Sequence, residues 1–92
     1  MPLTQRVTFK TTLKKRNLIY IPKLIRWQYK LEPSQVLKVT VRVVGAMGLC
    51  ESFLSKTYKD GRIHMPPLQL ALLKQRESTL DGFALEVSLE PA

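Results

Sequence analysis

The chain has 92 residues and a formal net charge of +8, from 15 lysine and arginine residues against 7 acids. This length suits one domain, and the charge favours a polyanionic partner, either nucleic acid or an anionic lipid surface. No stretch approaches the ~20 apolar residues of a membrane-spanning helix, and the lone Cys50 allows no internal disulfide, so we expect a cytoplasmic protein without membrane contact. With one histidine and one cysteine, neither a metal site nor a cofactor is expected.

The first half of the chain predicts strand, turn, strand, helix and strand. Alternation of apolar and polar side chains marks the strands. The helix opens at Pro22, whose fixed φ and missing N–H are harmless at a first helical position. The elements are a strand at 6–13, a turn at 14–17, a strand at 18–21, a helix from Pro22 to about Lys30 and a strand at 36–43. Along one side of the helix we expect Leu24, Ile25, Gln28 and Leu31.

The same order returns in the second half. Asp60-Gly61 is a tight-turn signal, and Pro66-Pro67 opens the second helix. The elements are a strand at 51–58, a short strand at 62–65, a helix carrying Leu68 to Leu73, a loop at 75–80, a turn at 81–82 and a strand at 83–90. In the last strand we expect Phe83, Leu85, Val87 and Leu89 to point inward.

These two halves are copies of one unit. A shift of 44 residues places Ile19 on Ile63 and Pro22 on Pro66, and a shift of 48 places Leu37 on Leu85. A long period that occurs only twice indicates a duplicated half-domain rather than a solenoid. We therefore predict one domain over 1–92, with repeat 1 at about 5–44, a joint at 45–48 and repeat 2 at about 49–90.

The predicted architecture is mostly β with two short helices. Each half supplies β-β-α-β, and six strands close most economically into a barrel, which removes free strand edges. We thus expect a six-stranded closed barrel with an internal pseudo-two-fold axis. Because both halves are fused, the protein is expected to be a monomer.

Both copies carry short segments typical of one family. These segments are Asp60-Gly61-Arg62-Ile63-His64-Met65-Pro66 in repeat 2, and Ile21-Pro22-Lys23-Leu24-Ile25-Arg26 followed by Leu31-Glu32-Pro33-Ser34-Gln35 in repeat 1. In them the chain resembles the AbrB-type swapped-hairpin half-domains. Its fused duplication is most similar to the small archaeal RIFT-barrel proteins of the cradle-loop barrel group.

The resemblance implies a DNA-binding, transcription-related role. Arg62 matches the family's Gly-Arg arginine, and Arg26 matches its helix arginine. Repeat 1 lacks the Gly-Arg arginine, because Leu18 stands at that position. Repeat 2 lacks the helix arginine, because Gln69-Leu70-Ala71 stand at the helix positions. A two-fold DNA site needs the same cations from both halves, so the sequence argues against a palindromic operator.

Positive charge is concentrated in the first copy. Residues 1–46 carry a net +9, and residues 47–92 carry −1. Such a cluster could contact nucleic-acid backbone with little sequence preference, or could be an ordinary solvated face. The candidate backbone contacts are Lys10, Lys14, Lys15, Arg16, Arg26 and Arg62.

Aromatic side chains offer a second kind of contact. Tyr20, Trp27 and His64 could stack against bases or another flat ring. The alternative is that Tyr20 and Trp27 cover the flank of the barrel and that His64 is a plain surface residue.

Two equivalent positions reverse their charge between the copies. Lys38 corresponds to Glu86, and Arg42 corresponds to Glu90. Either repeat 1 alone has a cationic recognition face, or the two strands are neighbours and these residues form cross-strand ion pairs.

Signals for catalysis are weak. No phosphate-binding glycine loop is present, and no nucleophile stands beside a base, so a non-enzymatic binding protein is expected. Cys50 is expected in the core as a small hydrophobe. One alternative is a barrel that binds a nucleotide or flavin-like molecule in a pocket lined by Tyr20, Trp27 or His64. Another is a protein–protein adaptor with an apolar patch near Leu70 and Leu73.

Overall fold

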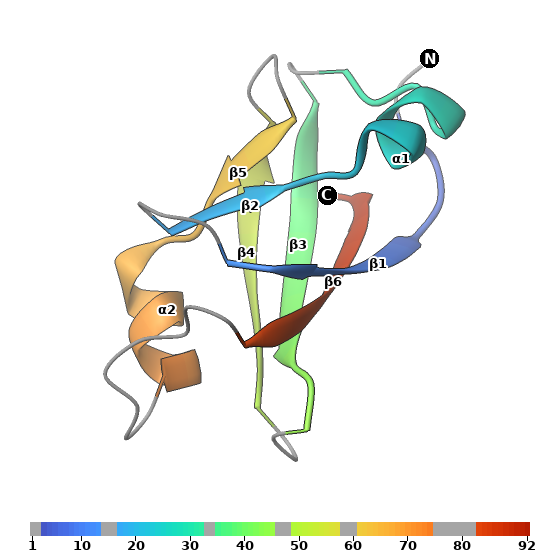
Figure 1. The fold of residues 1–92 in the computed structure, drawn as a ribbon. Helices are drawn as coiled ribbons and strands as arrows, with labels where there is room; N and C mark the ends of the chain where they lie inside the picture. The colour runs from blue at the N-terminus through green and yellow to red at the C-terminus, as the bar shows by residue number, and fades with distance from the viewer. Residues whose placement is uncertain (1–2, 14–16, 33–34, 46–48, 58–60, 75–82) are drawn as a thin grey trace.

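The computed structural model describes residues 3–13, 17–32, 35–45, 49–57, 61–74 and 83–92 (Figure 1). Within these ranges the element order is β-β-α-β, twice. The helices are α1 (Lys23–Gln28) and α2 (Pro67–Lys74). The strands are β1 (Val7–Thr12), β2 (Leu18–Tyr20), β3 (Val36–Val43), β4 (Cys50–Lys56), β5 (Arg62–His64) and β6 (Ala84–Pro91). Mostly β structure with two short helices is therefore confirmed, while the predicted turns and loops at 14–16 and 75–82 and the joint at 46–48 lie outside the described residues.

The strands form two sheets, so the prediction of a closed six-stranded barrel is wrong. One sheet is antiparallel in the order β1-β6-β3-β4, and the other is the two-stranded ribbon β2-β5. β2 and β5 are three residues long, and their ladder is with each other. Strands β1 and β4 contact this ribbon without joining its ladder, so they remain edges of the four-stranded sheet.

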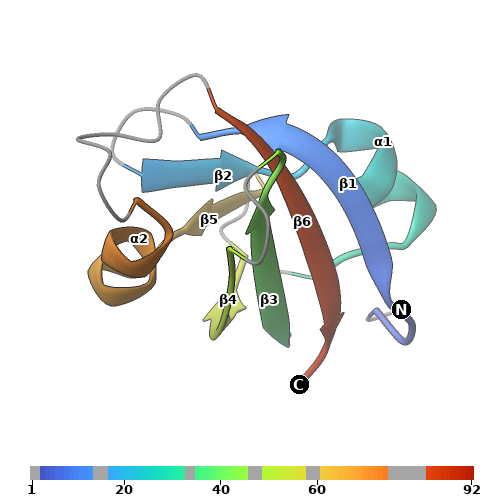
Figure 2. The ribbon, with the colours of Figure 1, turned by 90° about the horizontal axis from the view of Figure 1, so that it is seen from below.

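The ribbon packs across the concave face of the curved sheet, and the two helices lie beyond its opposite ends (Figure 2). The core fills the space between the two layers. Alternation along each strand turns the apolar side chains inward, as the sequence predicts for β3 and for Leu85, Val87 and Leu89 in β6. The most deeply buried side chains are Ile19, Leu37, Val39, Val41, Ile63, Met65, Leu73, Leu85, Val87 and Leu89.

The strand pairing has two-fold symmetry. Ile19 lies directly opposite Ile63, its equivalent in the other repeat, and Thr40 lies opposite its equivalent Ser88. Residues related by the repeat meet face to face only where a two-fold axis passes between them. Backbone bonds at the two ends of the ribbon obey the same rule: the Ile21 N–H donates to the Gly61 carbonyl at 2.9 Å, and the Met65 N–H donates to the Asn17 carbonyl at 3.0 Å.

The first helix is turned differently from the prediction. Leu24 is 74% exposed and Gln28 is also exposed, whereas Ile25, Tyr29 and Leu31 pack against the core. A six-residue helix can bury only one narrow stripe, and here that stripe follows Ile25 and Tyr29, one turn apart. The equivalent of Leu24 in α2, Leu68, is exposed as well.

Two further residues, Cys50 and Phe83, lie where the sequence does not predict them. Cys50 is exposed rather than buried, because strand alternation places it on the outer face of β4. Phe83 precedes β6 and is 38% exposed. Leu70 and Leu73 are buried, and the exposed leucines of α2 are Leu68 and Leu72.

Candidate functional site

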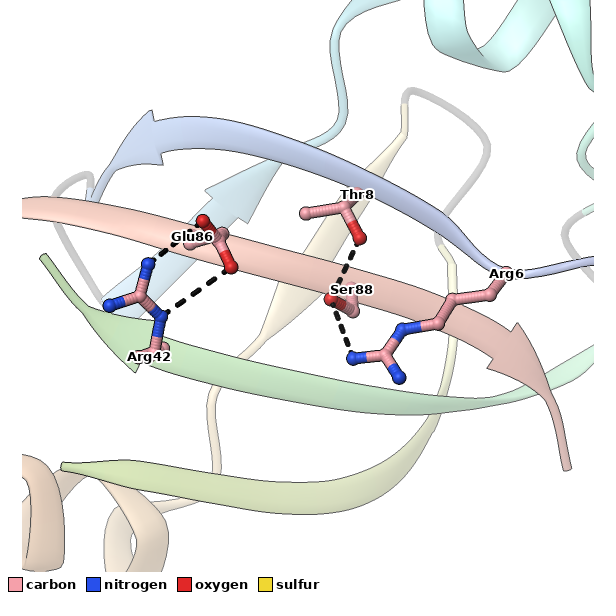
Figure 3. A network of polar contacts seen from close by, with 5 residues as sticks. All are labelled: Arg6, Thr8, Arg42, Glu86 and Ser88. Carbon is pink, nitrogen blue, oxygen red and sulfur yellow. Dashed lines mark hydrogen bonds and ion pairs between the residues drawn. The ribbon is translucent and has the colours of Figure 1, made fainter. Parts of the chain in front are cut away.

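Three cations of the outer face of the four-stranded sheet, Lys10, Lys38 and Arg42, lie opposite acids. The strand register sets Glu86 between Lys10 on β1 and Arg42 on β3, and it sets Lys38 opposite Glu90. Arg42 Nη2 donates to Glu86 Oε2 at 2.9 Å, and Arg42 Nε donates to Oε1 at 3.4 Å (Figure 3). The positive charge of this face is therefore largely balanced by β6.

This arrangement decides the meaning of the reversed charges in favour of cross-strand pairs. Lys38 and Glu86 are equivalent in sequence, but they are not opposite each other. Because the two strands run antiparallel around a two-fold axis, each residue lies opposite the equivalent of a different residue. Arg42 therefore pairs with Glu86, and Lys38 lies opposite Glu90. Two copies of repeat 1 in this position would set lysine against arginine, which only a fused and diverged chain avoids.

Hydroxyl groups fill the middle of the same face. The Thr8 and Ser88 hydroxyls lie 3.0 Å apart, and the equivalent Ser52 and Thr40 hydroxyls are also 3.0 Å apart. Arg6 Nη2 donates to Ser88 Oγ at 3.3 Å (Figure 3). Ser88, although only 4% exposed, thus has its hydroxyl satisfied, and this part of the face is occupied by its own contacts.

Replacing Glu86 by glutamine is expected to remove a pH-dependent part of the stability. The hydrogen bond and charge of Arg42, helped by the charges of Lys10 and Arg6, hold the pKa of Glu86 below the usual glutamate range. The pair therefore stabilises the fold above the unfolded-state pKa of about 4.3, and this contribution is lost as pH falls through the folded-state pKa. Urea unfolding at low salt should show a wild-type advantage over Glu86→Gln at pH 7 that shrinks at pH 3. An advantage that is equal at both pH values would contradict this assignment.

The outer surface of the ribbon has a different character. Tyr20 on β2 lies opposite Arg62 on β5, and Leu18 lies opposite His64. Ile19 and Ile63 point into the core between them, so these four side chains share the surface that faces away from the sheet. Tyr20 is 39% exposed and His64 is exposed. No acidic residue occurs in β2, α1 or β5.

Arg26 reaches this surface from α1. Its side chain packs over Gly61, because a Cβ added to Gly61 would lie 2.5 Å from Arg26 Nε. The Nε atom is buried and has no hydrogen-bond partner among the described residues. Gly61 directly precedes Arg62, which faces Tyr20. Arg26, Arg62 and Tyr20 therefore gather at one end of the ribbon.

The exposed side of α1 carries a further aromatic ring and a further cation. Trp27 is 64% exposed, and Lys23 Nζ lies 4.6 Å from the centre of its ring. The sequence signal for this contact is the spacing of four residues on a helix, which places a lysine and an aromatic ring on the same side. We define the ribbon–α1 face as Tyr20, Lys23, Arg26, Trp27 and Arg62, of which the sequence analysis missed only Lys23.

The structure places the predicted contact residues on different surfaces. Arg26, Arg62, Tyr20 and Trp27 belong to the ribbon–α1 face, and His64 lies at the other end of the same ribbon. Lys10 is on the outer face of the sheet beside Glu86 and is not part of this group. Lys14, Lys15 and Arg16 lie outside the described residues.

The comparisons with known proteins inform the fold alone. The chain is similar to the solution structure of PHS018 from Pyrococcus horikoshii, with a TM-score of 0.72 and 21% identity over 91% of this chain and 88% of that one. No protein-family model and no curated protein sequence matches the chain. In the part of the chain that the structure describes, no helix is long and apolar enough to cross a membrane, and no three His, Cys, Asp or Glu side chains come together as metal ligands.

Proposed function

We propose that the protein binds the phosphate backbone of nucleic acid through the ribbon–α1 face. The observation that carries this proposal is the contrast between the two surfaces. On the sheet Lys10, Lys38 and Arg42 lie opposite acids on β6, whereas β2, α1 and β5 supply three cations and no acid. A surface rich in cations attracts phosphates, and binding releases their counterions.

Arg26 and Arg62 are the central contacts in this proposal. The side chain of Arg26 is held against Gly61, where its Cδ, Nε and Cζ atoms pack. A guanidinium that is already ordered loses less rotamer freedom on binding, and its planar fork matches a phosphate group. The resemblance of both residues to the DNA-approaching arginines of AbrB-type half-domains supports the same assignment.

The other two functions expected from the sequence have less support. A ligand-binding pocket at a barrel mouth requires a closed barrel, which is not formed. For the adaptor, Leu70 and Leu73 are buried, and only Leu68 and Leu72 among the leucines of α2 are exposed. We further propose that the protein acts as a monomer, since one chain supplies both halves of the fold, and that it works in the cytoplasm, where a lone thiol remains reduced.

Replacing both Arg26 and Arg62 by glutamine is expected to weaken binding by at least about tenfold at 50 mM salt, because each loses a charge-assisted phosphate contact. The slope of log affinity against log salt should also become less steep by about 2. Fluorescence anisotropy with labelled 12-nucleotide DNA and RNA at 50–200 mM salt measures both quantities.

The matched control for this experiment is the pair Lys38→Gln and Lys56→Gln. Both residues are exposed on the outer face of the sheet, so the control removes the same charge from the other surface. An equal loss in the two double variants would show that net charge matters rather than the ribbon–α1 face. Affinity that does not change with salt would overturn the proposed function itself.

A further inference from the structure

We propose that the ribbon–α1 face selects single-stranded over duplex nucleic acid, with a base stacked on Trp27 and a neighbouring base on Tyr20. This inference rests on the proposed function. The proposal follows from the position of the aromatic side chains, from their cationic neighbours and from the asymmetry between the two repeats.

Trp27 is placed as a contact residue rather than as part of the core. It is 64% exposed and does not belong to the buried cluster, although its neighbours Ile25 and Tyr29 pack against that cluster. Lys23 lies over the ring and limits its motion. An indole on the surface beside cations offers a stacking platform. The alternative, that Trp27 covers the flank of the fold, does not agree with this large exposed fraction.

The same surface provides phosphate contacts next to both rings. Tyr20 faces Arg62 across the ribbon, and Arg26 comes from the turn of α1 that also carries Trp27. Aromatic platforms that alternate with cations are the arrangement that binds a strand with its bases turned toward the protein and its phosphates alongside. In a duplex the base faces are stacked on one another and are not available to such platforms.

The second repeat does not reproduce this surface. At the positions equivalent to Tyr20, Lys23, Arg26 and Trp27 it has His64, Pro67, Leu70 and Ala71. A two-fold fold that bound a two-fold duplex would present the same groups twice. One binding surface in one half suits a single strand, which has no two-fold axis.

The experiment uses the full chain, whose only tryptophan is Trp27, so intrinsic fluorescence reports on this residue directly. The probes are labelled dT12 and rU12, a 12-base-pair duplex, and an abasic 12-mer that keeps the phosphates. Single strands should bind about tenfold more tightly than the duplex and should quench Trp27 fluorescence. The abasic strand should bind weakly and without quenching.

Substitutions at Trp27 separate stacking from charge. Trp27→Ala should weaken dT12 binding by roughly 5- to 100-fold and weaken duplex binding much less, so that the preference for the single strand is lost, while Trp27→Phe should keep most of the affinity. Because the side chain is outside the core, both variants are expected to unfold at the wild-type temperature.

The outcomes distinguish this inference from the proposed function. Salt-dependent binding with equal affinity for duplex, abasic strand and dT12 would overturn the selection of single strands and leave backbone binding intact. No salt-dependent binding to any of these probes would overturn both. A blue shift of Trp27 fluorescence on vesicles of phosphatidylglycerol, with no response to oligonucleotides, would assign Trp27 and Leu24 to a lipid surface instead and would also overturn both.

Discussion

Replacing Ile63 by alanine is expected to lower the free energy of unfolding by about 2–5 kcal/mol, the range found when a large core residue becomes alanine. Ile63 is fully buried and lies directly opposite Ile19, which is also fully buried, at the centre of the ribbon. Both belong to the core between the ribbon and the sheet. In a domain of this size the loss corresponds to a fall of roughly 10–30 °C in Tm.

Thermal and urea unfolding followed by circular dichroism measure this effect, and the two-fold pairing supplies a second test. Ile19→Ala should cost about as much as Ile63→Ala, since the two residues occupy equivalent places. The control is Leu54→Ala, because Leu54 is 65% exposed on the outer face and should change stability by less than about 0.5 kcal/mol. Equal losses in Leu54→Ala and Ile63→Ala would contradict the placement of the core between ribbon and sheet.

The parts of the fold that the sequence predicts correctly are those set by local pattern or by the repeat. Alternation in residues 36–43 predicts the inward face of β3, and the equivalence of Ile19 and Ile63 anticipates two residues that meet at the two-fold axis. Whether the strands close into a barrel is not set by local sequence. It depends on whether the three-residue strands β2 and β5 pair with β1 and β4 or with each other, and the residue pattern is the same in both cases.

In the candidate site too, features set by residue type are predicted, and features set by the pairing of distant segments are not. Charge and aromatic content mark Arg26, Arg62, Tyr20 and Trp27 as contacts. The structure brings the first three to one end of the ribbon, and Trp27 is exposed on α1 next to Arg26 in the chain. The sequence also groups Lys10 with them, because it is close along the chain and cationic. The partner that separates Lys10 from the group is Glu86, on a strand from the other repeat, and only the register of β1 against β6 reveals it.

The packing of Arg26 on Gly61 is another contact between distant segments, and it makes Gly61 the second residue with a large expected effect. Gly61 has φ +80, a conformation that costs an ordinary residue about 1–2 kcal/mol. A Cβ there would also lie 2.5 Å from Arg26 Nε and 2.9 Å from Cζ, so the guanidinium would have to move. Gly61→Ala should therefore lower the free energy of unfolding by about 2–3 kcal/mol, through backbone strain and displaced packing together.

The two causes can be separated by substitutions that each relieve only one of them. The equivalent position in repeat 1 is Asn17, which has φ 60, so Gly61→Asn should relieve most of the backbone strain while the overlap with Arg26 remains. Combining Gly61→Ala with Arg26→Ala should remove the overlap while the strain remains. Unfolding of the single and double variants gives their coupling free energy, expected at about 1 kcal/mol, and strictly additive losses would contradict the contact. If Gly61 holds Arg26 ready for a phosphate, Gly61→Asn should also weaken nucleic-acid binding nearly as much as Arg26→Gln, although its fold is less strained than that of Gly61→Ala.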